Sequence, residues 1–197
     1  MKLIVFFNGW GMDENVVSHL KVPANHVLKV VNFPYKVNAS TFNRYEEIIF
    51  IGWSFGSYYL ARYLSENSIK YKKAISVNGS PETIGKNGIS EKIFNFTLNT
   101  LTPDTLQKFY KNMEIDTSFL PPLKNFYNIK EELQYFKDNY IPQKNVFTHA
   151  FIGKNDKIIS AANQKRFFNS IGTAITELSC GHYPFFIIKD WFALIGE

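Results

Sequence analysis

Ser54 has a glycine two residues before it and another two residues after it, in the run Gly52-Trp53-Ser54-Phe55-Gly56. The run follows an apolar stretch typical of a strand and precedes a stretch typical of a helix. A serine at such a junction, with glycine two residues before and after it, fits a nucleophile elbow, in which a sharp turn exposes the hydroxyl group. A chance pentapeptide in an ordinary strand-to-helix turn is the alternative. The strand-turn-helix context favours Ser54 as a nucleophile.

A serine hydroxyl attacks a carbonyl group only when a base takes its proton, so the chain should also supply a histidine. His19 and His26 both precede the serine, and His149 falls within an expected strand, where a core or sheet-face residue is more typical. His182 follows the last expected strand, in a loop that can reach the carboxyl edge of a sheet. This position predicts that His182 is the base.

The imidazole of such a base is usually oriented by a carboxylate from the end of a strand. Asp156 directly follows the expected strand 146–152. Asp104, Asp116 and Asp138 fall in a helix-rich segment, where carboxylates more often lie on solvated faces. Asp156 is therefore the predicted partner of His182, with an ordinary turn or N-cap aspartate as its alternative.

Attack on an acyl group also requires N–H donors for the negative charge on the oxygen. One is the backbone N–H of the residue after the nucleophile, here Phe55, and the second should come from the loop after an earlier strand. Asn8-Gly9-Trp10-Gly11 occupies that place. The backbone N–H of Trp10 is the predicted second donor, although Asn-Gly is also a common turn dipeptide.

These residues lie where apolar runs alternate with helix-like stretches. The expected strands cover residues 3–7, 26–33, 47–53, 74–78, 146–152 and 174–178, and the expected helices between or after them cover 14–20, 57–67, 161–170 and 185–195. Strands that alternate with helices favour a mostly parallel sheet flanked by helices. The predicted fold class is α/β, with six strands.

Residues 81–143 break this alternation, because they hold no convincing strand and are too long for a simple connection. Thr102 followed by Pro103 predicts a helix that runs to about Met113. Asn128 with Glu131 resembles a capping box for a second helix, ending near residue 139. The segment is rich in aromatic residues, and its lysines and acidic residues nearly balance. We therefore expect a core of residues 1–80 and 144–197, with a helical cap over residues 81–143.

Length, composition and charge do not indicate a nucleic-acid-binding protein. The 197 residues amount to about one domain, and 45% of them are hydrophobic. The formal net charge is +5, but the largest basic cluster is Lys70, Lys72 and Lys73, which is too small to predict a nucleic-acid partner.

Metal, redox and membrane roles are also disfavoured. The single cysteine, Cys180, makes no CxxC motif, and the four histidines lack metal-ligand spacing. The apolar run at the start is too short for a signal segment or a membrane span. We expect a cytoplasmic protein without a metal, a cofactor or a membrane partner.

The chain resembles the α/β-hydrolases and, more specifically, the small esterases of the BioG type. These enzymes demethylate pimeloyl-[acyl-carrier protein] methyl ester in biotin biosynthesis. The resemblance covers nearly the whole chain and rests on Phe7-Asn8-Gly9-Trp10-Gly11, Trp53-Ser54-Phe55-Gly56, Val77-Asn78-Gly79-Ser80, Asp156-Lys157-Ile158, Ala162-Asn163-Gln164 and Gly181-His182-Tyr183. It implies a Ser54, Asp156 and His182 triad, and a shortened sheet that begins at the third strand of the superfamily.

The resemblance also implies an acyl-carrier protein as partner. Related esterases of this pathway meet that acidic protein through basic cap residues, whereas this cap has no arginine. Lys108 and Lys111, three residues apart on one expected helix, are the candidate contacts. A second departure is Asn8, which stands where the oxyanion loop of the superfamily often has histidine.

The expected function is therefore a serine carboxylesterase that acts on a carrier-bound acyl methyl ester. A general short-chain carboxylesterase or a thioesterase is the alternative, because a triad defines the reaction class and not the substrate. A hydrolase fold used only for binding is disfavoured by the complete triad. The acyl chain length, the cap position and the oligomeric state stay open.

Overall fold

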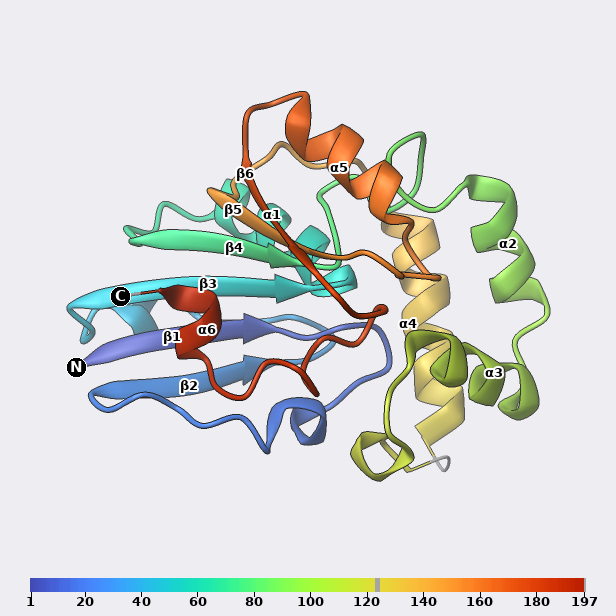
Figure 1. Cartoon of the computed structure of the whole chain (residues 1–197), viewed down its shortest axis with the longest axis horizontal. Coiled ribbons are helices and arrows are strands. Elements are labelled where there is room, and N and C mark those ends of the chain that lie inside the picture. The colour runs from blue at the N-terminus through green and yellow to red at the C-terminus, as the bar shows by residue number, and fades with distance from the viewer. Residues whose placement is uncertain (123–124, 197) are drawn as a thin grey trace.

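A six-stranded parallel sheet forms the centre of the molecule (Figure 1). The computed structural model describes residues 1–122 and 125–196, so residues 123 and 124 of the expected cap and residue 197 of the expected core lie outside the described part. The strands are β1 (Lys2–Phe7), β2 (His26–Val31), β3 (Glu47–Trp53), β4 (Lys73–Val77), β5 (His149–Gly153) and β6 (Ala174–Leu178), in the spatial order β2-β1-β3-β4-β5-β6. The predicted α/β class and the six strands are confirmed.

The chain reverses its direction of winding at β1. Strand β1 pairs with β2 on one side, where Phe7 lies opposite Val31, and with β3 on the other, where Phe7 lies opposite Gly52. In an open α/β sheet, a crevice forms outside the carboxyl ends of the strands at such a switch point. The loops after β1 and β3 are therefore neighbours, although more than 40 residues separate them in the sequence.

Both faces of β1 are covered, which explains its uninterrupted apolar sequence. Successive side chains of a strand point to opposite faces. Phe7 packs against Tyr63 of helix α1 (Phe55–Glu66), whereas Phe6 packs against Phe185 and Trp191 near the carboxyl terminus. Helix α5 (Ala161–Asn169) connects β5 to β6.

In the described chain, three α-helices and a 3-10 helix (Thr117–Phe119) separate β4 from β5, and we call the three α-helices the inserted helices. They are α2 (Glu91–Asn99), α3 (Pro103–Met113) and α4 (Phe126–Asn139), and they lie beyond the carboxyl ends of the strands (Figure 1). Helix α3 begins with the predicted Thr102 cap and Pro103, and it ends at the predicted Met113. No capping or periodic pattern predicted helix α2.

The capping box predicted at Asn128 is wrong, because α4 begins at Phe126, after the cap residue Asn125. Its buried positions Ile129, Leu133 and Phe136 form one apolar stripe. Packing of this stripe extends the helix past a favourable capping pattern.

Two other predicted helices are largely irregular. The segment 14–20 contains only a short 3-10 turn, Glu14–Val17, and the segment 185–195 contains only helix α6 (Phe192–Ile195). The reason is tertiary pairing: Lys21 bridges to Asp190, and the Trp191 N–H donates to the Lys21 carbonyl oxygen. None of the described helices is long and apolar enough to span a bilayer.

Candidate active site

Ser54 occupies a sharp turn between β3 and α1. Its φ of 55° and ψ of −123° are rare for a residue with a side chain. The turn is held by hydrogen bonds from the Ser54 N–H to the Val77 carbonyl and from the Ser57 N–H to the Ser54 carbonyl. A methyl group on Gly56 would overlap the Phe7 carbonyl, and one on Gly52 would lie 2.6 Å from the Ser57 Cα atom. Both glycines of the predicted elbow are thus required by the close approach of helix and strands.

The structure brings Ser54, His182 and Asp156 together in one hydrogen-bonded line. His182 Nε2 lies 2.9 Å from Ser54 Oγ, and His182 Nδ1 lies 2.8 Å from Asp156 Oδ2. An ionised carboxylate only accepts hydrogen bonds, so Nδ1 carries the proton and Nε2 presents its lone pair to the serine hydroxyl. All three residues are buried. This is the arrangement needed to withdraw a proton from Ser54.

The Asp156 carboxyl group is held on both oxygens. Oδ1 accepts the N–H groups of Ile158 and Ile159 at 2.8 and 2.9 Å, and Oδ2 accepts the Gln164 amide at 3.0 Å in addition to His182. These bonds prevent rotation of the carboxyl group. Gln164 therefore orients Asp156, a role that was not predicted from the sequence.

The loop that carries His182 is anchored by Asn78 at the end of β4. The Asn78 amide donates to the carbonyl oxygens of Gly181 and His182 at 3.0 and 2.9 Å, and its Oδ1 accepts the Gly153 N–H. The Trp53 indole donates to the same His182 carbonyl at 3.0 Å. Asn78 thus joins the ends of β4 and β5 to the histidine loop.

The predicted oxyanion donors lie beside the serine. Trp10 and Phe55 line one pocket with Ser54 and His182, and within the described chain neither backbone N–H is engaged by another group. The loop after β1, residues 8–11, is held by Asn8, whose Oδ1 accepts the Gly9 N–H at 2.9 Å and whose amide donates to the Asp13 carbonyl at 2.7 Å. Asn8 therefore shapes this loop, which we call the β1 loop.

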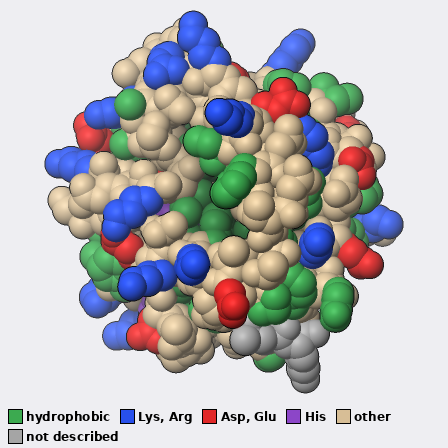
Figure 2. Space-filling model, turned by 90° about the vertical axis from the view of Figure 1, so that its right-hand side faces the viewer, with side chains coloured by type: hydrophobic (Ala, Val, Ile, Leu, Met, Phe, Trp, Pro, Cys, Tyr) green, Lys and Arg blue, Asp and Glu red, His purple; other side chains and the backbone are tan. Residues whose placement is uncertain are grey.

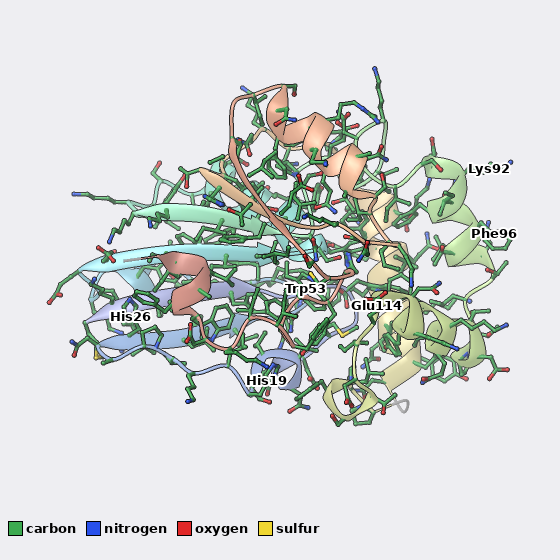
Figure 3. All side chains as sticks on the ribbon, viewed as in Figure 1. His19, His26, Trp53, Lys92, Phe96 and Glu114 are labelled. Carbon is green, nitrogen blue, oxygen red and sulfur yellow. The ribbon has the colours of Figure 1, made fainter. Side chains whose placement is uncertain are left out.

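The pocket above Ser54 has a volume of about 170 Å³ and is mainly apolar. Side chains of the inserted helices line it, among them Phe94 of α2, Phe109 of α3 and Leu133 of α4. Figure 2 views this face and shows a hollow with hydrophobic side chains at its base and several lysine or arginine side chains around it. Trp53 lies at the carboxyl end of β3, on the side toward α3 and α4 (Figure 3).

Aromatic contacts tie the pocket to the inserted helices. The Phe55 ring stacks on Phe136 of α4 with 4.2 Å between ring centroids, and the Trp10 ring meets Phe109 edge-on at 5.0 Å. The Trp10 indole N–H donates to the Ile129 carbonyl at 2.8 Å. Both candidate oxyanion residues are therefore packed by helices that belong to the insertion.

The other candidate residues lie away from this line. The ring of His19 reaches the Phe185 carbonyl, His149 bonds Thr176, and Asp116 caps a 3-10 turn. Lys108 and Lys111 are exposed on α3, next to the pocket residues Phe109 and Asn112. No group of three metal-binding side chains occurs in residues 1–122 and 125–196.

A substitution of Asn78 tests the anchor. Asn78 has a φ of 45°, so Asn78→Gly removes the amide without backbone strain and should lower the free energy of unfolding by about 2 to 4 kcal/mol. Asn78→Ala should lower it by about 1 kcal/mol more, because alanine disfavours positive φ. Urea denaturation measures both. Asn25→Gly, at an exposed residue with a φ of 63°, is the matched control and should be close to neutral. Wild-type stability of Asn78→Gly would contradict the assigned role.

Comparisons with known proteins find relatives that match nearly the whole chain. The family model described as pimeloyl-ACP methyl esterase BioG matches residues 1–194. A curated relative from Bacteroides fragilis, named malonyl-[acyl-carrier protein] O-methyltransferase, is 31% identical over 95% of this chain. The chain spans only 40% of that relative's length, so the relative's name describes a much longer protein.

Solved structures show the same relationship. The crystal structure of BioG from Haemophilus influenzae has a TM-score of 0.83 and 28% identity, over 98% of this chain and 94% of that one. A lipase-esterase related protein from Clostridium acetobutylicum has a TM-score of 0.63 and 14% identity, over 92% and 87%, and shares the α/β-hydrolase fold. The resemblance expected from the motifs is confirmed: the chain belongs to the family of the pimeloyl-ACP methyl esterase BioG, a family of carboxylic ester hydrolases.

Proposed function

We propose that this protein hydrolyses the methyl ester of pimeloyl-[acyl-carrier protein], and that Ser54, His182 and Asp156 carry out the reaction. The observation that carries the proposal is the hydrogen-bonded line from Asp156 through His182 to Ser54 at the base of an apolar pocket, in a member of the BioG family. The products are methanol and the free acid, still attached to its carrier.

The geometry supports a two-step acyl transfer. Ser54 Oγ attacks the ester carbonyl carbon while its proton moves to His182 Nε2, and Asp156 stabilises the imidazolium that forms. The N–H groups of Trp10 and Phe55 receive the negative charge on the carbonyl oxygen. His182 then returns the proton to the departing methoxide, and methanol leaves. Water activated by His182 releases the acid in the second step.

The pocket supports the choice of a neutral ester end. Its aromatic and aliphatic walls bury methylene groups at about 0.8 kcal/mol each, which favours a medium acyl chain over acetate. A free carboxylate would lose its hydration at the same place, at a cost of several kcal/mol unless it were paired. Hydrolysis creates that charge beside Ser54, so the product is released more readily than the substrate.

The inserted helices complete the proposal as a cap. Residues 81–143 would form this cap over a core of residues 1–80 and 144–197. An acyl-carrier protein would dock on the cap, with Lys108 and Lys111 as contacts, in the cytoplasm. A thioesterase that cleaves the carrier bond is the second candidate, because the same triad would attack either carbonyl carbon.

Substitutions separate the triad from other polar residues. Ser54→Ala should lower ester hydrolysis by several orders of magnitude without unfolding the protein, because triad members act as a unit. Asp156→Asn should lower turnover by roughly 10³ to 10⁴, because the amide favours the wrong tautomer of His182. Steady-state kinetics on a short-chain aryl ester measure both. Asp104→Asn on α3 is the control, and an equal loss there would refute the choice of acid.

Mass spectrometry of the carrier protein tests the substrate. After incubation with pimeloyl-carrier methyl ester, the expected product is lighter by one methylene group, with the acyl chain still attached. The Ser54→Ala variant should leave the substrate unchanged. Release of the whole acyl chain would instead identify a thioesterase.

Charge reversal tests the docking residues. Lys108→Glu combined with Lys111→Glu should raise KM for the carrier-bound ester about tenfold, since like charges at an interface disfavour association. The same variant should hydrolyse a free short-chain ester at the wild-type rate. Lys70→Glu, at the opposite end of the sheet, serves as the control. An unchanged KM for the carrier substrate would remove both lysines from the proposal.

A further inference from the structure

Glu132 is a buried acid close to the site, and no step of the proposed reaction uses it. It lies on α4, its side chain is turned toward the β1 loop, and the residue is only 5% exposed. Within residues 1–122 and 125–196 it forms no ion pair. A buried carboxylate without a cation is costly, so its surroundings must explain its presence.

Two hydrogen bonds connect Glu132 to the β1 loop. Its Oε2 accepts the Gly11 N–H at 3.0 Å. Its Oε1 lies 3.1 Å from the Tyr35 hydroxyl oxygen, which in turn lies 3.0 Å from the Asn8 carbonyl oxygen. Glu132 therefore reaches both ends of the loop, directly at Gly11 and through Tyr35 at Asn8.

The number of protons available at the Tyr35 hydroxyl indicates whether the Glu132 carboxyl group is protonated. The Tyr35 hydroxyl has one proton, but two oxygens lie within hydrogen-bond distance of it. Each of the two contacts has a proton of its own only when Glu132 Oε1 is protonated and donates to Tyr35, which then donates to the Asn8 carbonyl. Oε2 keeps the Gly11 N–H. Every polar atom in this chain of contacts is then satisfied, and no charge is buried.

The electrostatic surroundings agree with the neutral form. Burial raises the pKa of Glu132 to about 8, although the bonds from Gly11 and Tyr35 act in the opposite direction. The titratable side chains that face it from other elements are Tyr35 in the loop after β2, Tyr59 on α1 and Tyr110 on α3. Burial raises the pKa of all three tyrosines. The negative charge of Asp13 also raises the pKa of Tyr110.

We propose that Glu132 is a positioning residue that works in its protonated form and holds the β1 loop so that the Trp10 N–H points at the developing oxyanion. Trp10 stands between the two anchored ends of the loop, and its indole is fixed to the same helix at Ile129. The inference rests on the proposed function of Trp10 as an oxyanion donor.

Ionisation of Glu132 would remove one bond from this set. The Tyr35 proton would then be shared between the carboxylate and the Asn8 carbonyl, and a negative charge would lie behind a site that must stabilise an oxyanion. Activity should therefore fall as the pH rises through about 8. Glutamine copies the protonated acid, because its amide donates to Tyr35 and its oxygen accepts from Gly11 at every pH.

The test compares pH profiles of kcat on a short-chain aryl ester. Wild type should lose activity above about pH 8. Glu132→Gln should keep kcat at pH 7 within about threefold of wild type and should not show the decline at alkaline pH. Glu132→Leu should lower kcat by about tenfold to a hundredfold with little change in KM. Glu131→Gln, at the exposed neighbour on α4, removes the same charge and should behave as wild type. An alkaline decline retained in Glu132→Gln would overturn the inference, as would equal losses in the Gln and Leu variants.

Thermal unfolding gives a readout that does not depend on activity. Since the folded protein retains a proton that the unfolded chain releases near its ordinary pKa, wild type should lose stability relative to Glu132→Gln as the pH rises toward 8. A constant difference between pH 5 and 8 would overturn the protonated assignment. An inactive wild type that still shows this pH-dependent difference would refute the proposed function and not the protonation of Glu132.

Discussion

The close approach of helix α1 to strands β1 and β3 is the constraint on which the rest of the site depends. It forces Ser54 into positive φ and leaves no room for a side chain at Gly56 or Gly52. The same approach places the Phe55 N–H at the amino terminus of α1, beside the loop after β1. The proposed nucleophile and the proposed donor at Phe55 therefore result from one packing geometry.

The remaining groups are brought to this point by strand ends. Asp156 follows β5, the histidine loop follows β6, and Asn78 at the end of β4 ties them together through the Gly153 N–H and two carbonyl oxygens. Each of these contacts joins residues far apart in the sequence. The parallel sheet makes them possible because it collects the carboxyl ends of all its strands along one edge.

The sequence predicted what local patterns encode. The glycine-flanked serine, the alternation of strands and helices, and the Thr102-Pro103 helix start all depend on neighbouring residues. Contacts between residues far apart in the sequence have no such local pattern. Glu132 accepts a hydrogen bond from Gly11, 121 positions away, and no motif joins the two. The irregular segment before α6 was misjudged for the same reason, since its pairing with Lys21 overrides its helical pattern. Asn78 and Gln164 lie within motifs typical of the family, but their roles became visible only from their partners.

The β1 loop is hydrogen-bonded to α4, and this distinguishes α4 from the other inserted helices. Helix α4 is joined to that loop by the indole bond at Ile129 and by the Gly11 contact, and to Phe55 of α1 by the stacked ring of Phe136. A rigid swing of all three helices would displace the proposed oxyanion donors. Helices α2 and α3 share no hydrogen bond with the β1 loop in the described chain, and α2 exposes Phe96 to solvent. In the proposed function, an entrance beside α2 would open without breaking a hydrogen bond to the β1 loop, whereas an entrance beside α4 would break two of them.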